Sequence, residues 1–156
     1  MPTEIKDKYS TSTALTITLN GLGNGIARQS TIVDNTSNRY SRIVIYAKLR
    51  QSTSVTPTGN RTCTFYLLRD DNHGTNHRTD GAGASDTTIT IQNAQLIGVL
   101  NNKPSPSTGD YLYGEFIIDN PGPKWGIAVQ NDTGQALGST AGDHWLRYVG
   151  INPEAQ

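Results

Sequence analysis

The sequence lacks several features that would point directly to a compartment or a chemistry. Cys63 is its only cysteine in 156 residues, so no disulfide can form within the chain. No apolar run approaches the roughly 18 residues of a membrane-spanning helix, and the N-terminus has no basic segment followed by an apolar stretch. We therefore predict no signal peptide, no membrane partner and synthesis in a cytoplasm.

The charges show no excess of either sign. Thirteen basic residues balance 13 acidic ones, so no net field attracts the chain to a nucleic acid backbone or to an anionic membrane. We therefore predict no nucleic acid partner. A near-zero net charge also removes the repulsion that keeps proteins apart, which favours a molecule that packs against others.

Helical periodicity, heptads and internal repeats are absent as well, and apolar residues instead alternate with polar ones at period two. This pattern predicts an all-β protein with no propeller, solenoid or coiled coil. Turn-forming residues separate the expected strands, which are 13–19, 26–33, 40–50, 61–69, 87–91, 94–100, 111–118, 125–130 and 144–151.

Eight or nine strands with uneven loops predict a single-domain, two-sheet β-sandwich over residues 13–156. A jelly roll is favoured, and an immunoglobulin-like sandwich is the alternative, although it would lack its cysteine pair. Residues 1–12 are polar and show no periodicity, so they are expected to form a flexible N-terminal arm unless a partner orders them.

Two strands show clear faces. In 40–50 the inward side chains are expected to be Ile43, Ile45, Ala47 and Leu49, and the outward ones Arg42, Tyr46, Lys48 and Arg50. In 61–69 both sides are apolar, which predicts a strand covered on both faces. Cys63 lies within it and is expected to be a buried, inert thiol.

No set of residues with catalytic spacing is present, so we predict no enzyme, no catalytic residue and no cofactor-binding residue. His144 stands beside Trp145 and is expected to be structural. Glu115 is the only acidic residue inside an expected strand, so a carboxylate pair would have to come from loops.

The polar stretch 70–86 is long for a structureless connection and is therefore a candidate functional or disordered loop. Its acidic residues and His73 and His77 could bind a divalent cation, but glycines argue against the helix that would place the histidines together. We favour a solvated loop and predict no metal-binding residue. Whether the loop binds a metal or a glycan stays open.

Aromatic residues offer two interpretations. Trp125, Trp145, Tyr40, Tyr46, Tyr111, Tyr113 and Tyr148 could line a sugar platform, but strand aromatics more often pack. Trp125 is expected to anchor one end of the core. Outward Tyr46 and its basic neighbours, with Tyr111 and Tyr113, have the composition of a protein interface, or they simply cover a sheet face.

Two segments resemble small virion structural proteins encoded near the capsid genes of tailed bacteriophages. The first is ALTITLNGL at 14–22 with ARQS at 27–30 and VDN at 33–35, and the second is PKWGIAVQNDTG at 123–134. The quoted segments number 28 of the 156 residues. The matched framework positions include Gly21, Arg28, Trp125, Gly126 and Asn131, for which turns, strands and core packing are the expected roles.

The resemblance implies a non-enzymatic protein of the virion, a capsid decoration or cement protein that bridges neighbouring capsid subunits and stabilises the head. Its implied partners are the major capsid protein and copies of itself, as a homo-oligomer on the particle. The alternative is a carbohydrate- or receptor-binding head of a tail or fibre protein. A small hydrolase is the least favoured reading of the sequence.

Overall fold

The computed structural model describes residues 4–74, 78–81 and 83–155. In these residues the chain forms strands and one short 3-10 turn, η1 (Thr79–Gly81), with no α-helix. The strands are β1 (Ile5–Tyr9), β2 (Thr13–Leu15), β3 (Ile26–Gln29), β4 (Val33–Asp34), β5 (Arg42–Arg50), β6 (Thr62–Asp70), β7 (Thr87–Ile89), β8 (Gln95–Asn101), β9 (Tyr111–Asp119), β10 (Lys124–Asp132) and β11 (Trp145–Ala155).

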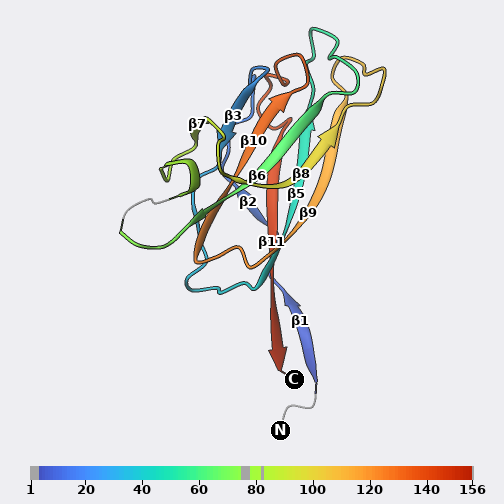
Figure 1. Cartoon of the computed structure of the whole chain (residues 1–156). Coiled ribbons are helices and arrows are strands. Elements are labelled where there is room, and N and C mark those ends of the chain that lie inside the picture. The colour runs from blue at the N-terminus through green and yellow to red at the C-terminus, as the bar shows by residue number, and fades with distance from the viewer. Residues whose placement is uncertain (1–3, 75–77, 82, 156) are drawn as a thin grey trace.

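The strands build two antiparallel sheets that pack face to face (Figure 1). One sheet, here called sheet A, has the order β1-β11-β5-β9, with β2 also paired to β11. The other, sheet B, has the order β7-β3-β10-β6-β8, with β4 also paired to β10. The predicted all-β two-sheet sandwich is confirmed.

The pairing is that of a jelly roll. Without β1, β4 and β7, eight strands remain, and they pair first with last: β2 with β11, β3 with β10, β5 with β9 and β6 with β8. The two sheets are then β2-β11-β5-β9 and β3-β10-β6-β8. A chain folded back on itself and rolled into two sheets gives this order.

The core lies between the sheets and follows the alternation in the sequence. Ile43, Ile45 and Leu49 of β5 are fully buried, as expected for the inward face of this strand. Trp125 of β10 is also fully buried, and its ring meets that of Tyr148 edge-on at 5.1 Å between centroids. The prediction that Trp125 anchors the core is confirmed.

Strand β6 is covered on both sides, as predicted. Cys63, Phe65 and Leu67 point into the main core, whereas Leu68 on the other side is buried with Ala128 in a second, smaller cluster. This second cluster is completed by half-buried side chains that include those of Ile89 and Ile91. The chain after β6 therefore folds back over the outer face of sheet B.

Two glycines among the matched framework positions have different roles. Gly21 has a φ of 64°, the left-handed conformation that favours glycine, and a Cβ there would meet nothing. At Gly126 a Cβ would collide with the guanidinium of Arg78. Gly21 is therefore needed for its turn, and Gly126 for the close approach of a side chain from the 70–86 stretch.

The segment 1–12 differs from the expected unstructured arm. Glu4 and beyond are described, and β1 pairs antiparallel with the end of β11, with Tyr9 opposite Ile151 and Ile5 opposite Ala155. All five residues of β1 are exposed. The order comes from main-chain pairing with a distant strand, which leaves no alternating pattern of burial in the sequence of β1.

Strand β1 and the end of β11 project beyond the sandwich as a two-stranded ribbon (Figure 1). We call β1 with residues 152–155 the ribbon. Its strands pair with each other, and in the described structure neither face of β1 is packed against the sandwich.

Candidate functional site: the outer face of sheet A

Sheet A turns one face to the core and the other to solvent, and the solvent side gathers large apolar residues. Nine large hydrophobic residues are exposed in the described part of the chain. Five of them lie on this outer face: Ile5 and Tyr9 of β1, and Tyr111, Tyr113 and Ile117 of β9. Exposed apolar residues gathered on one face mark a candidate interaction site.

Register places these residues together. Tyr9 lies opposite Ile151, Ile151 lies opposite Arg42, and Arg42 lies opposite Asp119 of β9. Paired residues in neighbouring antiparallel strands point to the same side of a sheet. The outer face of the ribbon therefore continues into the outer face of the sandwich, without a break in the sheet.

At the far end of this face lies an aromatic corner, which we define as Lys48, Tyr111, Tyr113, Trp145 and Arg147. The Lys48 ammonium stands 4.6 Å from the centre of the Tyr111 ring, and the ring centres of Tyr111 and Tyr113 are 6.0 Å apart. The Arg147 guanidinium lies 5.9 Å from the Trp145 ring. Cation and ring attract each other at such distances.

The charges of the outer face are partly paired. Arg42 donates to Asp119 at 2.6 Å, and this hydrogen bond is the main reason that the pKa of Arg42 is raised. Arg50 donates to Asp143 at 2.9 Å. Among the described residues Lys48 and Arg147 form no ion pair, so both cations of the aromatic corner remain available to a partner.

The sequence predicts part of the aromatic corner. The predicted outward positions of Tyr46 and Lys48 are confirmed by their pairing with Glu115 and Tyr113 on the same face of the sheet. The sugar platform does not include all seven aromatics, because Trp125 and Tyr148 are core residues and Tyr40 is half buried against the core. The ribbon was missed, since nothing in its five residues signals a partner strand far along the chain.

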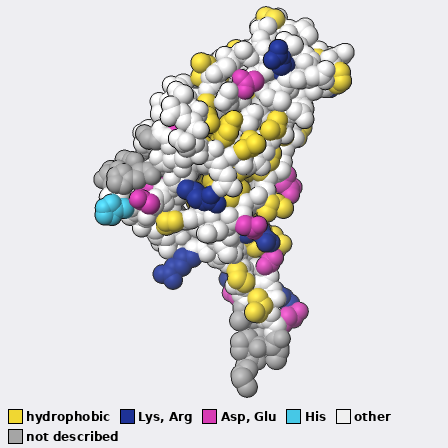
Figure 2. All heavy atoms as spheres, viewed as in Figure 1, with side chains coloured by type: hydrophobic (Ala, Val, Ile, Leu, Met, Phe, Trp, Pro, Cys, Tyr) yellow, Lys and Arg dark blue, Asp and Glu magenta, His cyan; other side chains and the backbone are white. Residues whose placement is uncertain are grey.

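The ribbon has two unlike faces. Ile5, Asp7 and Tyr9 alternate with Lys6 and Lys8 along β1, and the lysines pair with acidic residues: Lys6 with Glu4 at 3.0 Å and Lys8 with Glu154 at 2.9 Å. In the space-filling view the ribbon shows hydrophobic, basic and acidic side chains side by side (Figure 2). Its outer face is apolar at both ends, and its inner face is charged.

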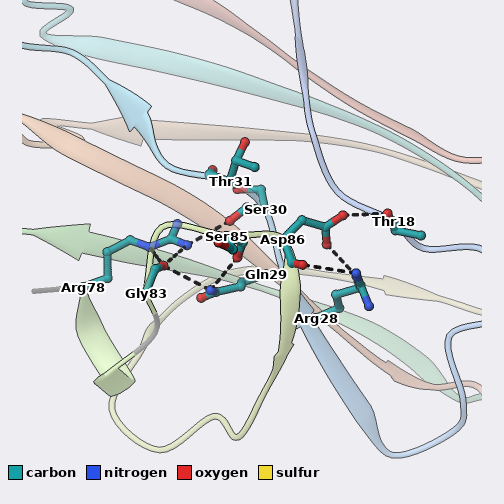
Figure 3. A network of polar contacts seen from close by, with 9 residues as sticks. All are labelled: Thr18, Arg28, Gln29, Ser30, Thr31, Arg78, Gly83, Ser85 and Asp86. Carbon is teal, nitrogen blue, oxygen red and sulfur yellow. Dashed lines mark hydrogen bonds and ion pairs between the residues drawn. The ribbon is translucent and has the colours of Figure 1, made fainter. Parts of the chain in front are cut away.

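The 70–86 stretch was the other candidate, and it is tied to sheet B by a polar network (Figure 3). Gln29 of β3 donates to the carbonyls of Gly83 and Ser85 at 3.1 and 2.8 Å. Arg28 donates to the Asp86 carboxylate at 2.5 Å, and Thr18 donates to the same carboxylate at 2.6 Å. These contacts hold the second half of the stretch against the sandwich.

Arg78 is the most buried charged residue of this network. It is 3% exposed and donates to the carbonyls of Ser30 and Gly83, at 2.9 and 2.7 Å. Burial lowers its pKa to about 10, and the nearby Asp70 carboxylate acts in the opposite direction. A guanidinium held by backbone carbonyls of two segments fastens them together, which is a structural role.

Asp80 fastens the same stretch at a second point. Its carboxylate accepts hydrogen bonds from the backbone N–H groups of Gln92, Asn93 and Ala94, at 3.1, 2.7 and 3.1 Å. Asp80 has a φ of 63°, in the left-handed region that aspartate tolerates better than most residues. By accepting these three hydrogen bonds, the Asp80 carboxylate stabilises the turn before β8.

The metal interpretation of this stretch gains nothing from the structure. His77 lies outside the described residues, while Asp70 is buried and Asp80 is occupied by backbone donors. Within the described ranges no group of three or more His, Cys, Asp or Glu side chains is arranged to hold a metal ion.

The remaining titratable candidates are also accounted for. Burial raises the pKa of the Cys63 thiol to about 12, so it is protonated at neutral pH. The Nδ1 atom of His144 accepts the backbone N–H of Arg50 at 3.1 Å, and its Nε2 donates to the Gly138 carbonyl at 2.8 Å. Burial lowers the pKa of His144, which is consistent with this neutral ring. The predicted burial of Cys63 is confirmed, and both ring nitrogens of His144 are bound by backbone groups.

Comparison with known proteins adds no relative: no family model and no curated protein matches the sequence. In the described residues no helix is long and apolar enough to cross a membrane.

Proposed function

We propose that this chain is a non-enzymatic structural protein of a bacteriophage virion, a capsid decoration or cement protein that binds across neighbouring capsid subunits and stabilises the head. Its partners are the major capsid protein and copies of itself. The observation that carries the proposal is the outer face of sheet A, which exposes large apolar side chains from the aromatic corner to the ribbon, whereas residues 87–94 cover part of the outer face of sheet B.

The chemistry of the outer face supports binding to protein. Tyrosine, tryptophan and arginine are enriched at protein interfaces, and Tyr113, Trp145 and Arg147 meet on this face. A projecting ribbon extends the reach of the molecule beyond a single contact. Modest contacts repeated at many positions on a particle add up to strong attachment. Jelly rolls also occur in viral coat proteins and in lectins, so the fold is compatible with both proposals made here.

The number of copies of this chain per phage particle tests whether it lies on the head. Quantitative peptide mass spectrometry of gradient-purified particles of the source phage gives the ratio of this chain to the major capsid protein. Hundreds of copies per particle are expected for a protein that covers the head. A handful of copies would move the chain to the tail or fibre, and its absence from particles would refute the virion proposal.

A substitution then tests the face. Tyr113→Ala with Arg147→Ala should lower the occupancy of particles that lack the native protein, because both side chains belong to the aromatic corner. Val55→Ala removes an exposed apolar side chain elsewhere and serves as the matched control. If the double variant and the control occupy particles equally, the aromatic corner is not part of the contact with the capsid.

The alternative function is a carbohydrate-binding head of a tail or fibre. The tilted Tyr111–Tyr113 pair beside Lys48 favours it, because aromatic faces with a nearby cation suit sugars that carry an acidic group. Binding to acidic glycans on a glycan array, lost in Tyr113→Ala and kept in Val55→Ala, would support this function. No glycan bound at any position would exclude the array's sugars as ligands.

A further inference from the structure

Each sheet has two edges, and three of these four edges carry features that hinder pairing with a further strand. On sheet A, β2 has only three residues and β1 carries Lys6 and Lys8. On sheet B, one edge ends in the short strands β4 and β7, and the other edge, β8, has a register shift opposite Phe65 and Tyr66. Short edge strands, lysines and bulges all discourage association between sheets.

The fourth edge, β9, has none of these features. It lies at one side of the molecule, and its nine residues pair with β5 in one continuous register, from Tyr111 opposite Arg50 to Asp119 opposite Arg42 (Figure 1). It contains neither lysine nor proline. A long edge strand without such protection is a template for another strand. Strand β9 is therefore the edge at which sheet A is open to strand addition.

The backbone groups on the open side of β9 follow from the hydrogen bonds at its two ends. The backbone N–H of Gln51 donates to the Asp110 carbonyl at 2.8 Å, and that of Asn120 donates to the Ser41 carbonyl at 2.8 Å. In an antiparallel pair, every second residue turns its backbone groups to the neighbouring strand. The even-numbered residues of β9 therefore face β5, and the odd-numbered residues point their N–H and C=O groups to the open side.

These open backbone groups define what can bind there. Strand β5 is the only strand paired with β9, and within the described residues no hydrogen bond reaches the backbone of Tyr113, Glu115 or Ile117 from the open side. An extended backbone matches such a row, because it presents donors and acceptors at the same spacing. The side chains agree, since Tyr113 and Ile117 are 65% and 62% exposed. The occupant of this edge is therefore a β-strand.

A second copy of the chain supplies such a strand, because a two-fold axis pairs an antiparallel edge with itself. Full overlap would place Glu115 opposite the partner's Glu115, and like charges directly opposite destabilise a strand pair. A register with Gly114 on the axis avoids this. Tyr111 then lies opposite the partner's Ile117, and Tyr113 lies opposite the partner's Glu115. Aromatic residues stabilise a sheet when they lie opposite β-branched ones.

We propose that the chain forms a symmetric dimer in which β9 pairs antiparallel with β9 of a second copy, with Gly114 on the two-fold axis. Residues 111–117 of the two copies pair, which joins both copies of sheet A into one continuous sheet. On the inner side Leu112 lies opposite the partner's Phe116, and on the outer side Tyr111 and Ile117 cover each other. This inference rests on the self-association that the proposed function includes, and it is tested on the purified chain alone.

The oligomeric state gives the first test. Sedimentation equilibrium across a concentration series should show the wild type reaching the dimer mass, while Ile117→Lys should weaken association by at least about tenfold. The new ammonium would lie beside the partner's Tyr111, over which the partner's Lys48 stands. Leu96→Lys is the matched control, because Leu96 is 56% exposed but lies on β8.

Two outcomes of this experiment would overturn the proposal. One is a wild type that stays monomeric up to about 100 μM. The other is a dimer that Ile117→Lys weakens no more than Leu96→Lys does, because the association would then not depend on β9.

Amide hydrogen exchange gives the second test, because it reports on the backbone groups themselves. At concentrations where the dimer forms, the amides of Tyr113, Glu115 and Ile117 should exchange at least about tenfold more slowly than in dilute solution. The amides of Leu112 and Phe116 face β5 and should be protected at both concentrations. Mass spectrometry with single-residue resolution measures this alternation. A dimer in which the three odd-numbered amides stay unprotected would contradict pairing through β9.

The two proposals can fail separately. A dimer that pairs through β9 while the chain is absent from phage particles would support this inference and refute the virion proposal. A chain that is abundant on particles but monomeric after purification would support the virion proposal and refute this inference.

Discussion

The outer faces of the two sheets differ in how much of each is covered by other parts of the chain. On sheet B the chain covers itself: Leu68 and Ala128 are buried beneath side chains from 87–94, and Arg78 and Asp80 fasten that covering. On sheet A the outer face stays open, with Tyr113 and Ile117 more than half exposed. The comparison shows that the chain covers part of one apolar sheet face, although Leu96 and Val99 of sheet B stay exposed, and leaves large apolar side chains of the other face to solvent.

The largest expected effect is a difference in the free energy of unfolding between variants on the outer faces of sheet B and sheet A. Leu68→Ala should lower the free energy of unfolding by about 2–5 kcal/mol, because it leaves a cavity beneath the covering segment. Ile117→Ala on the open face should change it by less than about 0.5 kcal/mol. Urea denaturation of both variants measures the difference. Similar losses would mean that the outer face of sheet A is packed in the isolated chain.

A second effect comes from the core that both sheets share. The thiol of Cys63 has its pKa raised from an ordinary 9.0 to about 12, so the unfolded chain loses the proton first as pH rises. Stability is then fully present below pH 9 and should fall by about 1.4 kcal/mol per pH unit above it. Denaturation at pH 8, 9.5 and 10.5 measures this slope.

The matched variant for the thiol is Cys63→Ala, which cannot titrate. Its stability should fall less steeply than that of the wild type over the same pH range, because other groups contribute equally to both. Parallel slopes in the two proteins would show that the thiol is not protected in the folded chain.

A smaller effect tests the fastening of the covering segment. Asp80→Ala should cost about 2 kcal/mol, because three backbone N–H groups lose a charged acceptor and alanine tolerates the positive φ poorly. Asp80→Asn keeps an acceptor oxygen and tolerance of that conformation, and it should cost less. Thermal unfolding ranks the two variants, and an equal cost would show that the carboxylate is not what holds the turn.

The smallest effect concerns the start of β11, next to the aromatic corner. His144 is neutral in the fold, and burial lowers its pKa below the ordinary 6.5, so the unfolded chain binds the proton first as pH falls. Stability should therefore be fully present above pH 6.5 and decline below it. His144→Gln should show less of this decline in melting curves at pH 7.5 and 5.5. If His144→Gln loses as much stability as the wild type between pH 7.5 and 5.5, groups other than His144 cause the loss.

Much of the fold could be predicted because burial leaves a period-two pattern. All nine expected segments contain strands, and the inward face of β5 follows the alternation of Ile43, Ile45 and Leu49. Expected segment 26–33 divides into β3 and the start of β4, because the backbone N–H of Thr31 between them donates to the Thr16 carbonyl, which lies outside the strands. In the sequence, the strand number, the uneven loops and the lack of a hairpin-only meander favour the jelly roll, but they do not specify which strands pair.

The candidate site was harder to predict, for a physical reason. The sequence predicts which residues of a strand point outward. It does not show that the outward residues of β5 and β9 lie side by side, because that depends on the pairing of strands that are distant in sequence. Both faces of the ribbon are exposed, and only two of the five residues of β1 are apolar, which is too few to mark a strand. Arg78 and Asp80 act through backbone groups, which carry no signature in the sequence.

The pairing of β11 has a consequence for the synthesis of the chain. β1 and β2 both have β11 as their partner strand, and β5 lies on its other side. While the chain is made, β1 and β2 must wait for β11, which is translated after every other strand of sheet A, and their edges remain unpaired in that interval. Such long-range closure is slow and leaves nascent chains open to aggregation. The yield of folded protein should therefore depend on translation rate and on chaperones more than its final stability suggests.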